Sequence, residues 1–361
     1  MSTPHYAVIL AGGRGERFWP LSTSRHPKQL LSLVGDTPLL AQAVDRLEGL
    51  IEPDHVFVIT NTDLVDASRR AAPSLPPGNV IGEPVGRDTA AAVALGAALV
   101  KARAPNGAFC ILTADHIIND LPLYRDTLRE GLALAHAQDV LLTIGIHPTK
   151  PATGYGYIES GEPVSHAGRI EFFRATRFVE KPDLATAQAY LSSGSYYWNA
   201  GMFMWSVASL EKAFGIHRPQ LADLIAALVP AIRAAALAPA LEREYAALEK
   251  ISIDYALMEK AGNIVMAKGT FPWDDVGSWS ALENHFDPDE DDNIRVGAAE
   301  LLNSSGNIVI SGNRLTALIG VSDLIVVQAD GATLVCPKDK AQDVRKLVEQ
   351  LRAAKQYDEI L

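Results

Sequence analysis

A glycine- and arginine-rich loop at residues 11–17 is the first segment whose residue types could do chemistry. It directly follows an apolar run at residues 6–10. Glycines let backbone N–H groups approach an anion closely, and Arg17 adds a planar charged fork. Lys28 follows soon after as a compact second cation. The segment predicts a phosphate-binding loop, although a tight turn with surface arginines would have a similar composition.

Two common nucleotide-binding motifs do not describe this loop. The Gly-x-x-x-x-Gly-Lys-Ser/Thr pattern of a P-loop is absent from the sequence. Gly13 and Gly15 are followed by Phe18, where a dinucleotide-binding fingerprint needs glycine or alanine. The residues therefore indicate a phosphate loop of another type.

Two acidic segments could bind a metal ion. Asp115 ends a strand-like apolar run, and Asp274 with Asp275 lies between two tryptophans. Mg²⁺ favours one or two carboxylates together with phosphate oxygens, so Asp115 and one carboxylate of the second segment could share it. Taken alone, Asp115 is better explained as a helix cap or a turn residue, and the simpler alternative for the second segment is an N-cap before a helix at residues 279–285.

Further along the chain, Glu180 and Asn199 could bind sugar hydroxyls, and Lys181 could bind a phosphate. Gly154 could mark a turn or a close approach of the backbone to a ligand. The simpler alternatives are a surface ion pair for Glu180 with Lys181 and a core strand around Asn199.

Alternating strand and helix patterns are expected to position these residues. The first 150 residues read as a doubly wound α/β sheet, with helices expected at the ranges 38–50, 89–103 and 121–137. Shorter strands follow up to about residue 215, and then a mostly helical stretch and one more strand. All of these are expected to complete one mixed, mostly parallel sheet.

A charged turn at residues 287–292 divides the chain. We expect a catalytic domain at 1–286 and a small C-terminal β domain at 287–361, built as a short solenoid with a closing helix. A solenoid of so few rungs buries little apolar surface by itself. We therefore expect the small domain to pack on the main domain or on another subunit, and a homodimer is plausible on this ground.

Composition sets limits on function. The formal net charge is −11, which argues against a nucleic-acid partner. No apolar run approaches the roughly 20 residues of a membrane span, and the N-terminus lacks a secretory signal. We therefore expect a cytoplasmic protein without membrane partners. An acidic chain that binds phosphates must cluster its cations or recruit a metal ion.

The order and spacing of these motifs closely resemble the bacterial mannose-1-phosphate guanylyltransferases, also called GDP-mannose pyrophosphorylases. The resemblance covers about residues 5–285. It rests on the segments 11–22, 27–29, 83–89, 114–116, 154–158, 178–182, 198–203, 252–256 and 275–279. The Phe18-Trp-Pro-Leu-Ser and Asp275-Val-Gly-Ser-Trp elements separate this family from thymidylyl- and uridylyltransferases.

The resemblance implies a nucleotide-diphospho-sugar transferase fold, a Mg²⁺ cofactor and the transfer of GMP from GTP to mannose 1-phosphate. It implies catalytic roles for Arg17, Lys28, Asp115 and Asp275, of which the two aspartates bind the metal. The residues implied for nucleotide binding are Ala11, Gly12, Gly13, Gly15, Glu83, Arg87 and Thr89. Those implied for the sugar phosphate are Gly154, Glu180, Lys181 and Asn199. Glu83 or a nearby backbone carbonyl is our candidate for reading guanine.

The sequence departs from the family at two positions. Thr113 stands where the family usually has proline, and Asp88 replaces an asparagine, which adds a negative charge near the base or ribose. About 70 residues follow the catalytic region, too few for the isomerase domain fused to many members, so we expect no isomerase activity. The alternatives are a related enzyme for another base or sugar, such as a glucose-1-phosphate thymidylyltransferase, or a non-catalytic subunit that binds nucleotide sugars.

Overall fold

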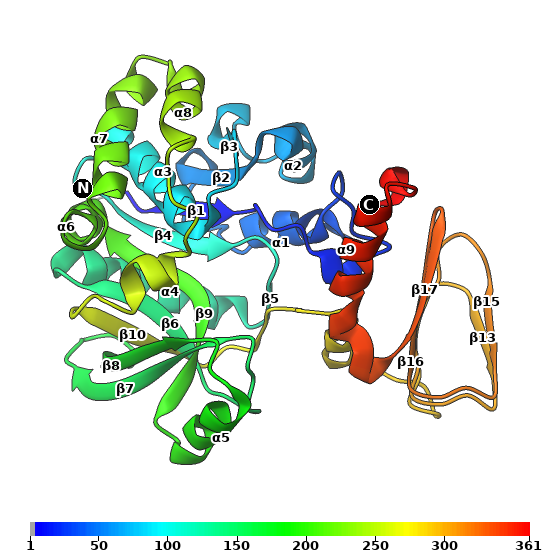
Figure 1. Ribbon diagram of the computed structural model, residues 1–361. Helices are drawn as coiled ribbons and strands as arrows, with labels where there is room; N and C mark the ends of the chain where they lie inside the picture. The colour runs from blue at the N-terminus through cyan, green and yellow to red at the C-terminus, as the bar shows by residue number, and fades with distance from the viewer. Residues whose placement is uncertain (1–3) are drawn as a thin grey trace. The chain divides into compact units, whose positions relative to one another are not determined.

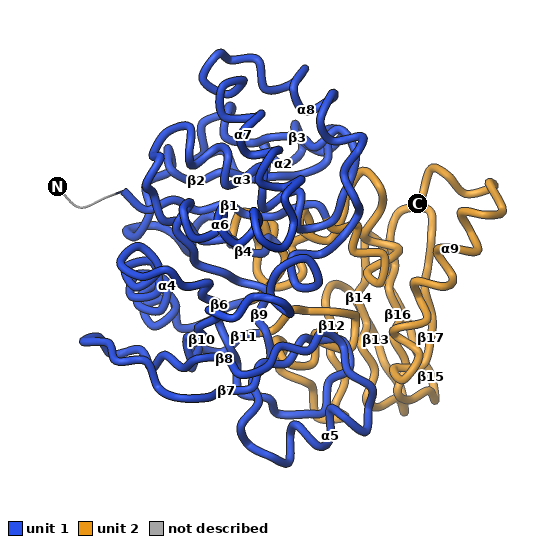
Figure 2. The backbone as a smooth tube through the Cα atoms, turned by 60° about the vertical axis from the view of Figure 1, so that its left-hand side comes forward, with its two compact units in different colours: residues 1–12, 43–114, 118–273 blue, residues 13–42, 115–117, 274–361 orange. Residues whose placement is uncertain are grey.

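The computed structural model describes residues 4–361, which group into two compact units (Figure 2). Unit 1 holds the chain up to residue 12 together with residues 43–114 and 118–273. Unit 2 holds residues 13–42, 115–117 and 274–361. The expected boundary after residue 286 divides the chain by position, whereas these units follow compactness, so residues 13–17 of the phosphate loop are grouped with the C-terminal part of the chain.

A mixed sheet of nine strands forms the middle of unit 1 within the described residues (Figure 1). Its order is β3-β2-β1-β4-β9-β6-β10-β8-β7. The strands are β1 Tyr6–Leu10, β2 Val56–Asn61, β3 Val80–Glu83, β4 Ala108–Thr113, β6 Leu141–Ile146, β7 Gly156–Val164, β8 Phe172–Glu180, β9 Tyr196–Ser206 and β10 Ile264–Gly269. The first four run parallel, whereas β9 is antiparallel to both of its neighbours β4 and β6. The predicted α/β class with a mixed sheet is confirmed.

Helices cover both faces of this sheet. The longer ones are α3 Asp88–Arg103, α4 Leu121–Ala137, α5 Leu184–Ser193, α6 Val207–His217, α7 Pro219–Arg233 and α8 Leu237–Tyr245. Strand residues Leu141 and Phe203 share a core with α3, α6 and α7. Gly131 of α4 instead faces Leu142 and Met204, the next residues along those strands. Because successive strand residues point to opposite faces, α4 lies on the other side of the sheet.

One expected helix is shorter than the sequence predicted. The range 38–50 contains only α1 Leu39–Asp45. After it the backbone tightens into turns, with Leu47 N donating to Val44 O at 3.0 Å. Gly49 then adopts a φ of 74°, a left-handed conformation that stops a helix.

Helix α3 is apolar on all sides because it is buried on all sides. It lies against β1 through Gly96, where an added Cβ would stand 2.8 Å from Val8 Cγ1. The helix begins at Asp88, soon after the end of β3 at Glu83. The close packing of α3 on β1 therefore helps to position residues 83–89 at the edge of the sheet where β1 also ends.

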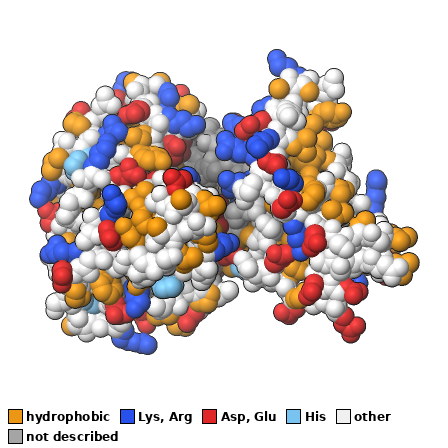
Figure 3. Space-filling model, turned by 60° about the horizontal axis from the view of Figure 1, so that its bottom comes forward, with side chains coloured by type: hydrophobic (Ala, Val, Ile, Leu, Met, Phe, Trp, Pro, Cys, Tyr) orange, Lys and Arg blue, Asp and Glu red, His pale blue; other side chains and the backbone are white. Residues whose placement is uncertain are grey.

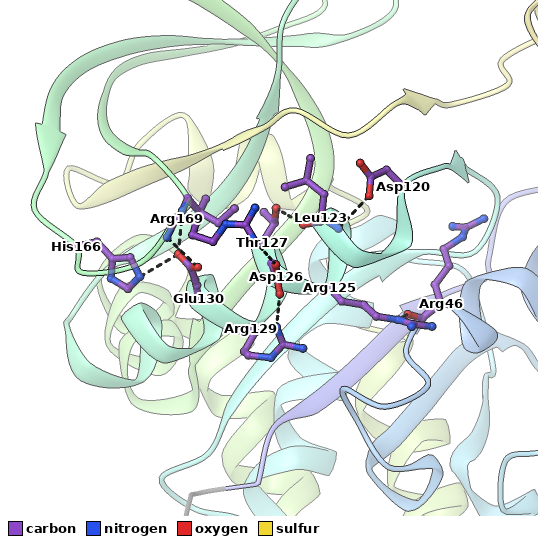
Figure 4. A network of polar contacts seen from close by, with 11 residues as sticks. Arg46, Asp120, Leu123, Arg125, Asp126, Thr127, Arg129, Glu130, His166 and Arg169 are labelled. Atoms are coloured by element: carbon purple, nitrogen blue, oxygen red, sulfur yellow. Dashed lines mark hydrogen bonds and ion pairs between the residues drawn. The ribbon is translucent and has the colours of Figure 1, made fainter.

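Figure 4 shows the polar network that ties α4 to the turn between β7 and β8. The Glu130 carboxylate accepts hydrogen bonds from the N–H groups of Arg169 (3.0 Å) and Ile170 (2.9 Å) and lies 3.2 Å from His166 Nε2. Burial raises the pKa of Glu130, but these donors outweigh burial and the net pKa is lowered. The network fixes the first end of β8, whose other end carries Glu180.

Unit 2 contains a small β structure and a closing helix, as predicted. The strands are β12 Ile294–Val296, β13 Ala299–Leu302, β14 Ile308–Ile310, β15 Thr316–Ile319, β16 Leu324–Ala329 and β17 Ala332–Pro337, followed by α9 Val344–Ala354. Strands β12, β14 and β16 pair in parallel, as do β13 and β15, which is the pattern of a short β-helix. Ile294, Ile308 and Ile325 stack in register inside it.

Acidic and basic side chains alternate over the face drawn in Figure 3 and form no single basic field there. Among residues 4–361, no helix is both long and apolar enough to cross a membrane.

We expect Gly96→Ala to lower the free energy of unfolding by about 1–3 kcal/mol, because the new methyl group would overpack against Val8. Gly215→Ala in α6 is the matched control, since nothing lies within 4 Å of its added Cβ. That variant should gain about 0.5–1 kcal/mol from helix propensity. Denaturant unfolding of both measures the difference, and equal effects would show that α3 is not tightly seated.

Candidate functional site

The end of β1 holds the start of the phosphate loop in unit 1. Ala11 is buried, its N–H donates to Ile59 O at 2.8 Å, and its carbonyl accepts from Thr60 Oγ1 at 2.9 Å. Gly12 follows and is exposed, with Glu83 Oε2 3.9 Å from the position of a Cβ. The backbone at Gly12 is thus open to a ligand on the side where Glu83 lies.

The rest of the loop is shaped by Gly15 in unit 2. Gly15 has a φ of 63°, and a Cβ on it would lie 2.2 Å from Lys28 Cβ. Its carbonyl accepts hydrogen bonds from Ser22 Oγ (2.7 Å) and Phe18 N (2.9 Å). Only glycine fits this conformation and this approach, so Gly15 brings the loop onto Lys28. Gly13 is different, because it is exposed and has nothing within 4 Å.

Lys28 is the centre of the predicted catalytic group. Its side chain is 7 % exposed, and its Nζ lies 3.0 Å from Asp115 Oδ2 and 2.6 Å from the carbonyl oxygen of Asp275. Burial raises the pKa of Asp115, but the Lys28 charge and hydrogen bond outweigh burial and lower it. The structure therefore brings three of the four predicted catalytic residues together around one ammonium group.

Arg17, the fourth predicted catalytic residue, is half-buried and donates from Nη1 to Gly277 O at 3.1 Å. Gly277 also makes room for its neighbour, because a Cβ there would stand 3.1 Å from Asp275 Oδ2. Val276 between them has a φ of 46°, which is a strained conformation for a β-branched residue. The turn at residues 275–277 is thus held in an unfavourable shape beside both cations.

The two sequence elements that characterise the family resemblance pack on one another. The rings of Phe18 and Trp279 lie edge to face with centroids 4.9 Å apart. Trp279 Nε1 donates to Trp19 O at 3.1 Å. Lys28 Nζ lies 5.7 Å from the centroid of the Phe18 ring. These aromatics therefore form the apolar base under Lys28.

Of the two neighbouring aspartates, Asp274 forms hydrogen bonds with other residues of the protein. Its carboxylate accepts from Val276 N (2.7 Å) and Asn284 Nδ2 (2.9 Å) and lies 3.1 Å from His285 Nε2. The expected helix that follows it is a 3₁₀ helix, Trp279–Asn284. The N-cap of this helix is Ser278, and Asp274 instead closes the turn before it, which leaves Asp275 as the metal-ligand candidate of this segment.

The closing helix α9 also supports the loop. Glu16 lies 3.0 Å from Arg352 Nη2 and 3.7 Å from Arg345 Nε. Trp19 Nε1 donates to Ile360 O at 2.9 Å. No signal in the sequence pointed to this contact, because its partners are more than 300 residues apart.

Glu83 is a buried carboxyl group in unit 1. Burial raises its pKa to about 7, a hydrogen bond with Tyr245 opposes the rise, and the charge of Asp88 adds to it. Its Oε1 is buried, without a hydrogen-bond partner within the described residues. A buried acceptor of this kind is suited to a ligand donor.

Arg87 and Thr89 both hold the segment that follows α8. Arg87 Nε donates to Tyr245 O at 3.2 Å, and Thr89 Oγ1 accepts from Ile253 N at 2.8 Å. Both side chains are thus engaged within the protein, and their nucleotide contacts stay predictions.

Of the predicted sugar-phosphate residues, Gly154 lies just before β7, Glu180 and Lys181 lie at the end of β8, and Asn199 lies within β9. Glu180 Oε1 and Lys181 Nζ are 2.6 Å apart, so they form the ion pair that the simpler reading expected. Gly154 has nothing within 4 Å of an added Cβ. The close approach occurs at Gly156, where a Cβ would stand 2.4 Å from Glu180 Oε2 and 3.3 Å from Asn199 Cβ.

Two features of this region were not predicted from the sequence. Tyr155 lies edge to face with Trp198 and Trp273, with ring centroids 5.1 and 5.4 Å away, which gives an aromatic wall. Asp254 accepts a hydrogen bond from Asn199 Nδ2 at 3.0 Å. The tyrosine-glycine repeat at 154–157 and the Ser-Ile-Asp segment at 252–254 were the available signals.

Two family models match the chain. The nucleotidyl transferase model matches residues 6–292, and a mannose-phosphate isomerase/GMP-like β-helix model matches residues 299–351. The first of them covers more than half of the chain.

Curated relatives and a solved structure agree with these models. A Klebsiella pneumoniae mannose-1-phosphate guanylyltransferase is 38% identical, over 96% of this chain and 73% of the relative. The Escherichia coli K12 enzyme of the same name is 37% identical over the same shares. A Thermus thermophilus structure named as a mannose-1-phosphate geranyltransferase has a TM-score of 0.85 and 36% identity, covering 96% of this chain and 99% of that one.

We expect Gly15→Ala to lower the free energy of unfolding by at least about 2 kcal/mol. The alanine would sit in a left-handed conformation and its methyl group would collide with Lys28. Gly13→Ala, in the same loop but in open space, should change stability by less than about 0.5 kcal/mol. Thermal unfolding of the two variants measures the difference. A Gly15→Ala variant as stable as wild type would show that the backbone at Gly15 does not pack tightly against Lys28.

Proposed function

This chain belongs to the mannose-1-phosphate guanylyltransferases, within the nucleotidyl transferase family, and we propose that it transfers GMP from GTP to α-D-mannose 1-phosphate. The products are GDP-mannose and diphosphate. The observation that carries the proposal is the buried Lys28 ammonium held between Asp115 and Asp275, with Arg17 bound to the same turn as Asp275. This group has the charges that phosphoryl chemistry needs.

The nucleophile of this reaction is a phosphate oxygen of mannose 1-phosphate, which is already an anion. It forms a bond to the α-phosphorus of GTP, and the bond between that phosphorus and the bridging oxygen of diphosphate breaks. No general base is required. The enzyme must instead hold two anions in line and stabilise the charge that develops on the leaving diphosphate.

Arg17 and Lys28 have complementary roles in the proposal. The guanidinium offers several N–H donors in a planar fork for the oxygens of the leaving diphosphate. The ammonium acts as a point charge, and its burial strengthens its interaction with an anion. Local cations of this kind reconcile phosphate binding with a net charge of −11.

Mg²⁺ fits the two carboxylates proposed for it. The Asp115 carboxylate and the backbone carbonyl of Asp275 both accept from the Lys28 ammonium, which brings the two residues together, and Lys28 lowers the pKa of Asp115. Among the described residues no group of three or more His, Cys, Asp or Glu side chains could hold a metal ion. Phosphate oxygens and water would therefore complete the coordination. When bound, Mg²⁺ would neutralise phosphate charge and orient the leaving group.

Glu83 is the proposed reader of guanine. The base presents two neighbouring donors, N1–H and the 2-amino group, and an ionised carboxylate accepts from both. Glu83 lies beside exposed Gly12, and one of its oxygens is buried without a partner within the described residues. A backbone carbonyl nearby is the alternative reader.

Mannose 1-phosphate is proposed to bind at the start of β7, the end of β8 and Asn199 of β9. The Glu180 carboxylate would accept from sugar hydroxyls and Lys181 would bind the phosphate. Tyr155 and Trp198 would supply an apolar surface for the sugar ring. The oxygen and the nitrogen of the Asn199 amide both have protein partners, so among the described residues one N–H hydrogen is left for the sugar.

A panel of nucleotides and sugar 1-phosphates with Mg²⁺ tests the proposal. Diphosphate release should be fastest with GTP and mannose 1-phosphate, compared with dTTP, UTP and ATP and with glucose 1-phosphate. A preference for dTTP and glucose 1-phosphate would assign the chain to the related enzyme class instead. Binding of GDP-mannose without any turnover would point to a regulatory subunit.

Asp115→Asn should lower kcat by about 100-fold or more with the fold intact, because it removes a charge from the proposed metal site. Asp223→Asn, which neutralises an exposed carboxylate on α7, is the control and should retain activity. Circular dichroism checks the fold of both, and near-normal turnover of Asp115→Asn would remove Asp115 from the metal site.

Glu83→Gln should raise KM for GTP by about 10–100-fold where Glu83 is ionised, because the amide can accept from only one guanine donor. Burial places the Glu83 pKa at about 7, so the carboxylate forms as pH rises and the difference between wild type and variant should grow above that pH. Inosine triphosphate, which lacks the 2-amino group, is the matched ligand. The preference for GTP over it should shrink in the variant, whereas an unchanged preference would favour a backbone carbonyl as the reader.

A further inference from the structure

Asp254 is a half-buried carboxyl group beside the proposed sugar-phosphate site, and the reaction described above gives it no role. It starts a single turn of π-helix, Asp254–Met258, between α8 and β10. The residue before it, Ile253, is buried and bound through its N–H to Thr89 Oγ1 at 2.8 Å. The carboxyl group is therefore on a segment that is anchored to the start of α3.

The contact of Asp254 with Asn199 defines the orientation of the Asn199 amide. Asn199 Oδ1 accepts from Thr143 Oγ1 at 3.0 Å and from Gly201 N at 3.2 Å. Asn199 Nδ2 must then be the atom that donates to Asp254 Oδ1 at 3.0 Å. One amide hydrogen remains available, and the position of Asp254 decides where it points.

The carboxyl groups of Asp254 and Glu180 lie close to one cation, Lys181, in unit 1. Asp254 is faced by Glu180 of β8, by Lys181 directly after β8 and by Ser252 of its own segment, while Tyr255 interacts with Lys181. Lys181 pairs with Glu180 at 2.6 Å, and Glu180 N donates to Glu259 Oε1 at 3.1 Å. Ionisation of Asp254 therefore adds a second negative charge close to a cation that Glu180 already neutralises.

The electrostatics follow from this arrangement. Burial raises the pKa of Asp254 to about 7, and the charge of Glu180 adds to the rise, while Lys181 opposes it. Near neutral pH the residue thus changes between a neutral acid, which still accepts from Asn199 and can donate its own O–H, and a carboxylate.

We propose that Asp254 is a positioning residue for mannose 1-phosphate, which orients the Asn199 amide and permits tight binding of the sugar phosphate only while Asp254 carries a proton. The ionised form would repel the phosphate anion and compete with it for Lys181. This inference rests on the proposed function, since it takes mannose 1-phosphate as the ligand of these residues.

The test is KM for mannose 1-phosphate at saturating GTP, measured between about pH 6 and about pH 8 for wild type and Asp254→Asn. The asparagine keeps an acceptor for Asn199 and imitates the neutral acid. KM of wild type should rise by about tenfold over this range relative to the variant, because a group with a pKa of about 7 loses its proton there. The comparison cancels the titration of the substrate phosphate, and KM for GTP should be the same in both proteins.

Asp223→Asn is the control for surface charge and should follow the wild-type profile. Parallel profiles for wild type and Asp254→Asn would overturn the inference while the proposed function stands. Absence of GDP-mannose formation by wild type would overturn the proposed function itself.

A second measurement applies if Asp254→Asn does not fold. GDP-mannose has no phosphate that titrates near neutral pH, and Glu83→Gln removes the other raised carboxyl group. Calorimetric binding of GDP-mannose to Glu83→Gln should weaken by about tenfold between about pH 6 and about pH 8. Affinity that does not change over this range would refute the role of Asp254.

Discussion

The buried ion pair of Lys28 with Asp115 is the interaction on which the arrangement of the candidate catalytic residues in unit 2 depends. A buried ammonium is costly unless it is paired and hydrogen-bonded, and Lys28 satisfies this with one carboxylate and one backbone carbonyl. Its position requires glycine at residue 15, because the backbone passes directly over its side chain. It also requires the strained turn around Val276, which presents the carbonyl of Asp275. The glycine-rich loop and the Asp-Val-Gly-Ser-Trp element thus both contact Lys28.

Residues of unit 1 add a different kind of group, namely carboxyl groups whose burial raises their pKa to about 7. Glu83 and Asp254 both belong to this class. Glu83 lies beside Gly12 and hydrogen-bonds Tyr245 at the end of α8, whereas Asp254 lies beside the Asn199 amide on the segment that follows α8. The end of α8 and the connection from α8 to β10 therefore contact residues proposed for the base and for the sugar, respectively.

Much of the fold could be predicted from the sequence, because apolar runs and helical periodicity are local. The range 121–137 was recognised correctly as a helix, and the short solenoid was recognised from its β-like pieces. The length of helix α1 was overestimated, because the apolar pattern does not reveal the turns after Asp45 or the left-handed conformation of Gly49. The part played by Asp254 was missed for a related reason, since its partner Asn199 is 55 residues away and no periodicity connects them. The proximity of Asp115 to the second acidic segment was proposed from the residue types, whereas the grouping of Asp115 and Asp275 with Arg17 and Lys28 came from the family resemblance.

The large sequence separation between the loop and its partners has a consequence for synthesis of the chain. Lys28 and Asp275 are 247 residues apart, and Trp19 and Ile360 are 341 residues apart. At roughly 5–20 residues per second, a ribosome needs on the order of 10–50 s to reach Asp275 after Lys28 has been made. Throughout that interval Lys28 lacks the Asp275 carbonyl that it binds, and the complete candidate catalytic group forms late, after most of the nine-stranded sheet has been translated.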